Sequence, residues 1–118
     1  MIENKYILGI DGGGSKTEAV IFDEQGQTLI KYSARGTNLY VYKEIAIKLI
    51  IELIEKLTNK LNINYSDISA FGCSLAGISD LNYRDLLLNE FDKLKITSNT
   101  IILSEQTVEA TEYASCKL

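Results

Sequence analysis

Three consecutive glycines at residues 12–14 constrain the fold of this chain more than any other feature, because they lie between two strand-like runs. Residues 6–11 (YILGID) form a short apolar run, and residues 17–22 (TEAVIF) mix β-branched and aromatic side chains, as strands do. A turn signal, DEQG at 23–26, closes the second run. The segment GIDGGGSKT at 9–17 is therefore predicted to be a β-hairpin with a glycine-rich loop.

The hairpin prediction separates this loop from two better-known phosphate-binding loops. A Walker A loop needs a lysine directly after the second glycine of its pattern, but Gly14 is followed by Ser15, and Lys16 arrives one place late. A dinucleotide fingerprint needs a third small residue where Thr17 stands. Both of those loops also open a helix, whose free N–H groups receive the phosphate. Neither pattern fits this sequence.

A hairpin loop of this composition can still bind an anion. Glycine has no Cβ, so the backbone can adopt positive φ values and direct successive N–H groups toward one point. Ser15 and Thr17 add hydroxyls, Lys16 adds a positive charge, and Asp11 can hold Mg²⁺ through water. Phosphate together with a metal ion is the ligand that suits these groups. The alternative is a loose turn that Asp11 caps, with no ligand.

Turn signals and hydrophobic periodicity predict alternating helices and strands in the rest of the chain. In the longest expected helix, apolar residues recur at four-residue steps: Ile45, Leu49, Leu53, Leu57 and Leu61. In chain order the expected elements after the hairpin are strand 28–35, helix 42–61, strand 68–75, a helix capped by Ser79 or Asp80, strand 100–104 and a helix at 107–115. The order βββαβαβα predicts one α/β domain with a mixed five-stranded sheet, three antiparallel strands followed by parallel ones.

Composition narrows the expected function. With 118 residues, 46% of them hydrophobic, the chain is expected to form one domain with one core. A formal net charge of -4 leaves no basic face for a phosphate backbone, so nucleic-acid binding is not expected. The first residues hold only a short apolar run, which predicts neither a membrane span nor a signal peptide and indicates a cytoplasmic protein. Cys73 and Cys116 lie far apart and histidine is absent, which predicts buried or idle thiols rather than a zinc site.

Four segments carry a resemblance to a known family: DGGGSKT at 11–17, GTN at 36–38, SLAG at 74–77 and the strand-to-helix passage at 102–110. The chain resembles the actin-like ATPase superfamily, which also contains hexokinase and the heat-shock ATPases, and the resemblance implies a ribonuclease H-like domain. More narrowly, the chain is similar to the N-acetylglucosamine kinase branch of the BadF/BadG/BcrA/BcrD ATPase family. The likeness spans nearly the whole chain, and DGGGSKT is its specific element.

The resemblance implies a role for each matching residue. In that family the first hairpin holds the β- and γ-phosphates of ATP, and its leading aspartate organises Mg²⁺, which implies Asp11 for the metal ion. The nucleotide-phosphate residues implied in this sequence are Gly13, Gly14, Ser15, Lys16 and Thr17. The asparagine after the third strand touches the sugar in the kinases, which implies Asn38 together with Thr37, while Gly77 would let the substrate approach closely. A turn position before a helix for Asn38, and a plain strand-to-loop glycine for Gly77, stay open as alternatives.

The segment ILSEQTVEA at 102–110 departs from the family pattern. Sugar kinases of this superfamily carry an aspartate after the fifth strand as the base for the attacking sugar hydroxyl, and the aligned residue in this sequence is Glu105. Its extra methylene displaces the carboxylate by about 1 Å, which matters to a near-attack geometry. Glu105 is then the base of a reshaped cleft, part of an impaired site, or misaligned. A carboxylate that stabilises a helix N-terminus is an equal alternative.

The resemblance implies an ATP-dependent kinase that transfers the γ-phosphoryl group of Mg-ATP to a hydroxyl of an amino sugar such as N-acetylglucosamine. Kinases of this fold have two lobes, so residues 1–118 are expected to be the N-terminal lobe, without the C-terminal lobe and with little activity alone. Two alternatives stay open. One is an ATPase activator of a 2-hydroxyacyl-CoA dehydratase or benzoyl-CoA reductase system, with Cys116 as an iron–sulfur ligand, and the other is a non-catalytic nucleotide- or sugar-binding module. The choice of sugar and a homodimer of the full-length protein are also left open.

Overall fold

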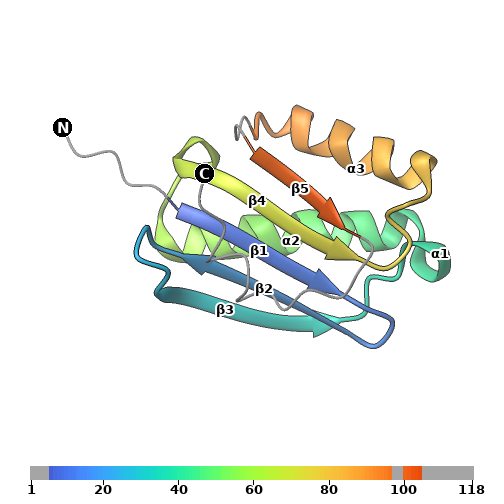
Figure 1. The fold of residues 1–118 in the computed structure, drawn as a ribbon, viewed down its shortest axis with the longest axis horizontal. Helices are drawn as coiled ribbons and strands as arrows, with labels where there is room; N and C mark the ends of the chain where they lie inside the picture. Colours follow the sequence, from blue (N-terminus) through green and yellow to red (C-terminus); the bar gives the residue numbers. More distant parts are fainter. Residues whose placement is uncertain (1–5, 97–99, 105–118) are drawn as a thin grey trace.

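The structure, a computed structural model, describes residues 6–96 and 100–104 and shows a sheet with helices packed on it (Figure 1). The elements in chain order are β1 (Tyr6–Gly12), β2 (Lys16–Phe22), β3 (Thr28–Arg35), α1 (Leu39–Tyr42), α2 (Glu44–Leu61), η1 (Tyr65–Asp67), β4 (Ile68–Leu75), α3 (Leu81–Lys93) and β5 (Thr100–Ser104). The helix expected at 107–115 and the candidate base Glu105 lie outside the described residues. Within them, the three-strand opening and the alternation that follows agree with the expected order.

The sheet contains five strands in the order β3-β2-β1-β4-β5. β2 pairs antiparallel with both β1 and β3, whereas β4 pairs parallel with both β1 and β5. Each parallel strand is reached through a helical connection, because a tight turn cannot join parallel neighbours. The α/β fold with a mixed sheet is therefore confirmed. The carboxyl ends of β1, β4 and β5 lie at one edge of this sheet (Figure 1).

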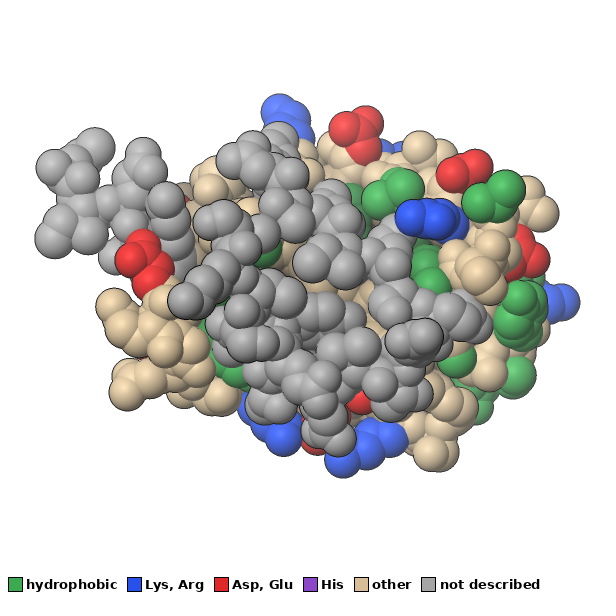
Figure 2. Space-filling model, viewed as in Figure 1, with side chains coloured by type: hydrophobic (Ala, Val, Ile, Leu, Met, Phe, Trp, Pro, Cys, Tyr) green, Lys and Arg blue, Asp and Glu red, His purple; other side chains and the backbone are tan. Residues whose placement is uncertain are grey.

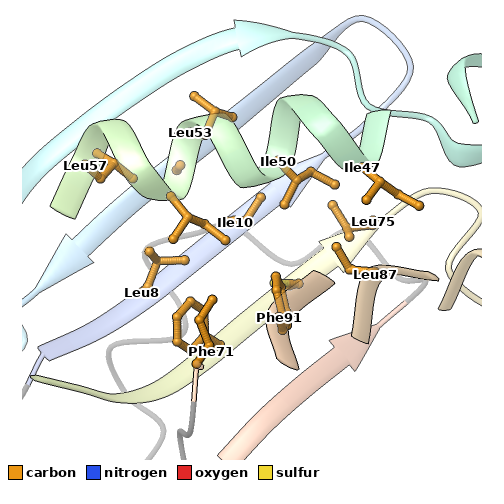
Figure 3. Packing of buried hydrophobic residues seen from close by; sticks show 14 of the residues in the cluster. Leu8, Ile10, Ile47, Ile50, Leu53, Leu57, Phe71, Leu75, Leu87 and Phe91 are labelled. Atoms are coloured by element: carbon orange, nitrogen blue, oxygen red, sulfur yellow. The ribbon is translucent and has the colours of Figure 1, made fainter. Parts of the chain in front are cut away.

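α2 and α3 cover one face of the sheet and bury the main hydrophobic core (Figure 3). Side chains alternate along a strand, so only every second residue of β1 and β4 reaches this face. The labelled core residues come from four elements: Leu8 and Ile10 from β1, Phe71 and Leu75 from β4, Ile47, Ile50, Leu53 and Leu57 from α2, and Leu87 and Phe91 from α3. The ring centroids of Phe71 and Phe91 are 5.6 Å apart, a tilted contact that joins α3 to the sheet.

The long helix differs from its prediction in two respects. It is interrupted at Lys43, whose φ of 53° and ψ of -126° separate α1 from α2. Its first predicted core position, Ile45, is 59% exposed. A four-residue step turns about 400°, so a series of such steps drifts about 40° each time and cannot stay on one face. The face that α2 buries combines three- and four-residue steps: Ala46, Ile47, Ile50, Leu53, Ile54, Leu57 and Thr58.

The opposite face of the sheet holds a smaller apolar cluster, in which Val20 and Phe22 of β2 are buried and Ile7 packs against them. Figure 2 views the molecule from this side and shows positive and negative side chains close together around the outline of the molecule. None of the helices in residues 6–96 is both long and apolar enough to cross a membrane.

Candidate functional site

Three connections meet at the sheet edge where β1 and β4 end: the β1–β2 loop, the β3–α1 link and the β4–α3 link (Figure 1). The N–H of Thr37 donates to the carbonyl of Gly13 at 3.0 Å, and the N–H of Ala76 donates to the carbonyl of Gly12 at 3.0 Å. The N–H of Leu39 in turn donates to the carbonyl of Ala76 at 2.9 Å. Backbone hydrogen bonds therefore hold the segments GTN and SLAG against the glycine loop.

The glycines of the loop differ in what surrounds them. A Cβ on Gly12 would collide with Oγ1 of Thr37 and would lie 2.8 Å from Cδ2 of Leu75, so no larger residue fits there. A Cβ on Gly14 would meet no heavy atom within 4 Å, and one on Gly13 would make an ordinary contact at 3.7 Å. None of the three adopts the positive φ that the sequence allowed. The underside of the loop is packed, and its rim is bare backbone of the kind that an anion can approach.

The hydroxyl groups of the loop divide in the same way. Ser15 lies exposed beside Gly14 at the rim. Thr17 is fully buried, and its Oγ1 lies 2.9 Å from Oγ1 of Thr37, which is also fully buried. Two residues that the sequence assigned to different ligands thus contact each other beneath the loop.

Lys16 lies at the rim with a partner that the sequence analysis missed. Its Nζ is 3.2 Å from Oε2 of Glu18, and Nζ of Lys31 on β3 lies 3.2 Å from the same oxygen. Hydrogen bonds from Lys16 and then Lys31 hold the pKa of the Glu18 carboxyl below its usual value. The available signal was the alternation K-T-E, which places Lys16 and Glu18 on one face of a strand. The Lys16 side chain is nevertheless 63% exposed to solvent.

Asp11 lies half-buried at the end of β1, between Glu18 of β2 and Ser74 of β4 in the sheet register. In the described part of the chain, no group of three or more His, Cys, Asp or Glu side chains is arranged to hold a metal ion. Mg²⁺ needs no such group, because it usually keeps several waters and binds through one or two carboxylates plus substrate phosphates. A carboxylate beside a bare-backbone loop fits that pattern.

Asn38 and Asp80 both cap helices. Oδ1 of Asn38 accepts the N–H of Tyr40 at 2.9 Å at the start of α1, and Oδ1 of Asp80 accepts the N–H of Asn82 at 2.9 Å at the start of α3. The predicted cap at Asp80 is therefore confirmed. For Asn38 the structure shows the turn-and-cap role that the sequence left open, and sugar contact stays a prediction.

Gly77 adopts φ 90° in the β4–α3 link, a conformation that favours glycine. A Cβ there would lie 2.9 Å from Cβ of Leu39 and 3.0 Å from the backbone nitrogen of Tyr40. The residue thus allows α1 to pack closely against the link that follows β4. Its predicted role in substrate approach stays a prediction.

The candidate base and the two cysteines are the remaining residues that the sequence singled out. β5 ends at Ser104, whose backbone pairs in register with Ser74 at the same sheet edge, and Glu105 is the next residue in the chain. Cys73 is fully buried in the core, and burial raises the pKa of its thiol to about 12. For Cys73 the structure therefore shows the buried thiol that the sequence predicted. Cys116 lies outside the described residues.

The chain is similar to a known protein family and, in its fold, to solved structures. The model of the BadF/BadG/BcrA/BcrD ATPase family matches residues 8–111. A candidate N-acetylglucosamine kinase from Chromobacterium violaceum matches 87% of this chain with 18% identity and a TM-score of 0.63. A reductive activator for a corrinoid, iron–sulfur protein matches 94% of this chain with 14% identity and a TM-score of 0.61. Curated protein sequences contain no match.

At these identities the two structures show the fold alone, and this chain spans 35% and 24% of their lengths. The family model covers most of the sequence, including all three connections at the sheet edge. On that match, the chain belongs to the BadF/BadG/BcrA/BcrD ATPase family.

Proposed function

We propose that this chain forms the N-terminal lobe of an ATP-dependent kinase, which transfers the γ-phosphoryl group of Mg-ATP to a hydroxyl of an amino sugar such as N-acetylglucosamine. One observation carries the proposal: the bare rim of the glycine loop lies at the same sheet edge as the links that contain Asn38 and Gly77. A kinase must hold a phosphate donor and a hydroxyl acceptor side by side, and this edge offers a group for each. Membership of an ATPase family and the fold likeness to a candidate sugar kinase support it.

On the phosphate side, the exposed residues are the proposed contacts. The N–H of Gly13 already donates to the carbonyl of Lys16 at 2.9 Å, so this glycine shapes the hairpin. The exposed backbone of Gly14 and Ser15 is then the surface that receives the β- and γ-phosphates, together with the ammonium group of Lys16. Asp11 would hold Mg²⁺ through water, and the ion would neutralise charge on the phosphates.

On the acceptor side, Asn38 is proposed to contact the sugar, while Glu105 is proposed to act as base. Oδ1 of Asn38 is used by the helix cap, which leaves its amide NH₂ as the group to donate to a sugar hydroxyl. Glu105 would take the proton of the sugar hydroxyl while the hydroxyl oxygen forms a bond to the γ-phosphorus. The bond from phosphorus to the bridging oxygen then breaks, and ADP leaves.

The proposed reaction needs a second lobe. Phosphoryl transfer depends on positioning and on exclusion of water, which a single exposed sheet edge does not provide. Because this chain spans 35% of the candidate kinase, we infer that a C-terminal lobe supplies the adenosine site and closes the cleft. Residues 1–118 alone are expected to show little turnover.

The test is ADP release by the full-length protein with Mg-ATP and a panel of amino sugars. We expect turnover that depends on the sugar, falls at least about a hundredfold in Glu105→Ala and persists in Asp80→Ala, whose side chain only caps α3. Turnover that ignores every sugar, or survives intact in Glu105→Ala, would contradict the proposed transfer or the proposed base respectively.

A reductive ATPase activator is the second candidate, and the fold likeness to the activator of a corrinoid, iron–sulfur protein favours it. Such an activator needs thiolates for a metal cluster. Cys73 does not serve, because its thiol is buried in the core with a raised pKa. Cys116 remains as the candidate ligand. Iron bound stoichiometrically to anaerobically purified protein, and lost in Cys116→Ser, would replace the kinase proposal with this one.

A further inference from the structure

A pair of buried hydroxyls joins the phosphate side of the site to the acceptor side. Oγ1 of Thr17, directly after the glycine loop, lies 2.9 Å from Oγ1 of Thr37, directly before Asn38. We propose that this pair, the hydroxyl lock (Thr17 and Thr37), sets the distance between the phosphate loop and the sugar-binding link without touching either ligand. The inference rests on the proposed function for its catalytic consequence, and its structural part stands independently.

Burial of both threonines argues against direct contact with a ligand. Both threonines have 0% exposed surface, whereas Gly14 and Ser15 of the same loop are exposed. The two hydroxyls share one hydrogen bond, in which either oxygen can be the donor while the other accepts. A ligand that displaced either hydroxyl from this bond would leave the other threonine without its partner in the core, which is unfavourable.

Two glycines allow the segments that carry the hydroxyl lock to pack closely. Gly12 has no Cβ, and a Cβ in its place would occupy the position of the Thr37 hydroxyl. Gly36, directly before Thr37, is equally restricted, because a Cβ there would collide with the backbone carbonyl of Gly14. Gly12 thus leaves room for the Thr37 hydroxyl, and Gly36 leaves room for the backbone of the glycine loop. The segments 12–14 and 36–37 fit together as one unit.

A second bond fixes the orientation of that unit. The N–H of Thr37 donates to the carbonyl of Gly13 at 3.0 Å, so Thr37 holds the loop through its backbone as well as its side chain. The next residue, Asn38, starts α1 through its cap. Movement of the loop relative to Thr37 would therefore move the donor relative to the acceptor. Phosphoryl transfer is sensitive to such movement, because the attacking and leaving oxygens must lie in line.

The kinetic test replaces each hydroxyl by a methyl group in the full-length enzyme: Thr17→Val, Thr37→Val and the double variant. We expect kcat to fall about tenfold or more in each, with the KM for Mg-ATP and for the sugar within about threefold of wild type. The double variant is expected to be no slower than the worse single variant, because both changes break one interaction. Thr17→Ser and Thr37→Ser, which keep the hydroxyl, should restore most of the activity.

Direct ligand contact makes the opposite prediction, and would overturn the lock. Thr17→Val would then raise the KM for Mg-ATP alone, Thr37→Val would raise the KM for the sugar alone, and the effects would add. The matched control is Thr58→Val, because Thr58 is also buried and its hydroxyl donates to the carbonyl of Ile54 within α2. It lies on α2, away from the three connections, and should leave kcat unchanged.

Amide hydrogen exchange tests the lock without any turnover. In Thr17→Val the N–H of Thr37, which is bonded to Gly13, should exchange at least about tenfold faster, while the N–H of Gln27, bonded to Asp23, should not change. Unchanged exchange at Thr37 would overturn the lock even in an active kinase. Faster exchange in a protein that phosphorylates no sugar would instead refute the proposed function and keep the lock. If a valine variant does not fold, the smaller Thr17→Ala and Thr37→Ala carry the same expectations.

Discussion

The underside and the rim of the glycine loop contain the same residue type under opposite physical conditions. At the underside, Gly12 faces Thr37 and Leu75 so closely that a Cβ has no room. At the rim, two positions later, a Cβ on Gly14 would have no neighbour within 4 Å. Packing within the chain therefore explains the first glycine and does not explain the second. One motif thus combines a glycine that packing requires with a glycine whose Cβ would face open space.

The largest effect is expected from Gly12→Ala. The added methyl group would displace the Thr37 hydroxyl and crowd the Leu75 side chain, so both overpacking and loss of the Thr17–Thr37 bond act against folding. We expect a loss of about 3 kcal/mol in the free energy of unfolding, measured by urea denaturation. A loss below about 0.5 kcal/mol would show that the underside is not packed as described.

The second effect concerns binding, and it comes from Gly14→Ala. The methyl group meets no protein atom, so the free energy of unfolding should stay within about 0.5 kcal/mol of wild type. On the proposed function, however, the same methyl group lies where phosphate approaches, and the affinity for Mg-ATP should fall about tenfold in a calorimetric titration. Unchanged affinity in Gly14→Ala would remove the distinction between underside and rim.

Sequence patterns were sufficient for the parts of this molecule that depend on neighbours along the chain. β3, β4 and β5 have the predicted bounds of 28–35, 68–75 and 100–104, because strand alternation and flanking turns are local signals. The Asp80 cap followed from the same kind of signal. The family resemblance implied ligand roles for the glycine loop and for the segments at 36–38 and 74–77, and the structure brings these segments to one sheet edge.

Features that depend on tertiary register were not predictable in the same way. Thr17 and Thr37 are twenty positions apart, and their contact exists only because β2 and β3 pair with Thr17 opposite Ala34. The break at Lys43 has no local signal, since lysine is an ordinary helix former. Gly12 and Gly14 look alike in sequence, because what a Cβ would meet is set by other segments. Glu105 stays a prediction from the family pattern alone.

A smaller effect separates two caps that have the same geometry. Asn38→Ala and Asp80→Ala each remove an oxygen that accepts a backbone N–H at 2.9 Å, so each should cost about 1 kcal/mol of stability. Only Asn38 lies in the link tied to the glycine loop, so only its variant should also raise the KM for the sugar. Equal kinetic parameters in the two variants would reduce Asn38 to a cap.

The smallest effect is expected at Glu18, whose carboxylate on β2 forms an ion pair with Lys16 at the rim of the loop. Since lysine contacts keep its pKa below the usual 4.5 in the folded protein, its carboxylate stabilises the fold above that pH, and the contribution disappears as the pH falls through the lowered pKa. The exposure of Lys16 limits this contribution to under about 1 kcal/mol. Unfolding free energies measured from about pH 6 to about pH 3 should therefore fall more steeply in wild type than in Glu18→Gln. Glu90→Gln, which removes one carboxylate from an exposed pair with Lys93, is the matched control. Parallel curves for wild type and Glu18→Gln would mean that the ion pair between Lys16 and Glu18 does not contribute to stability.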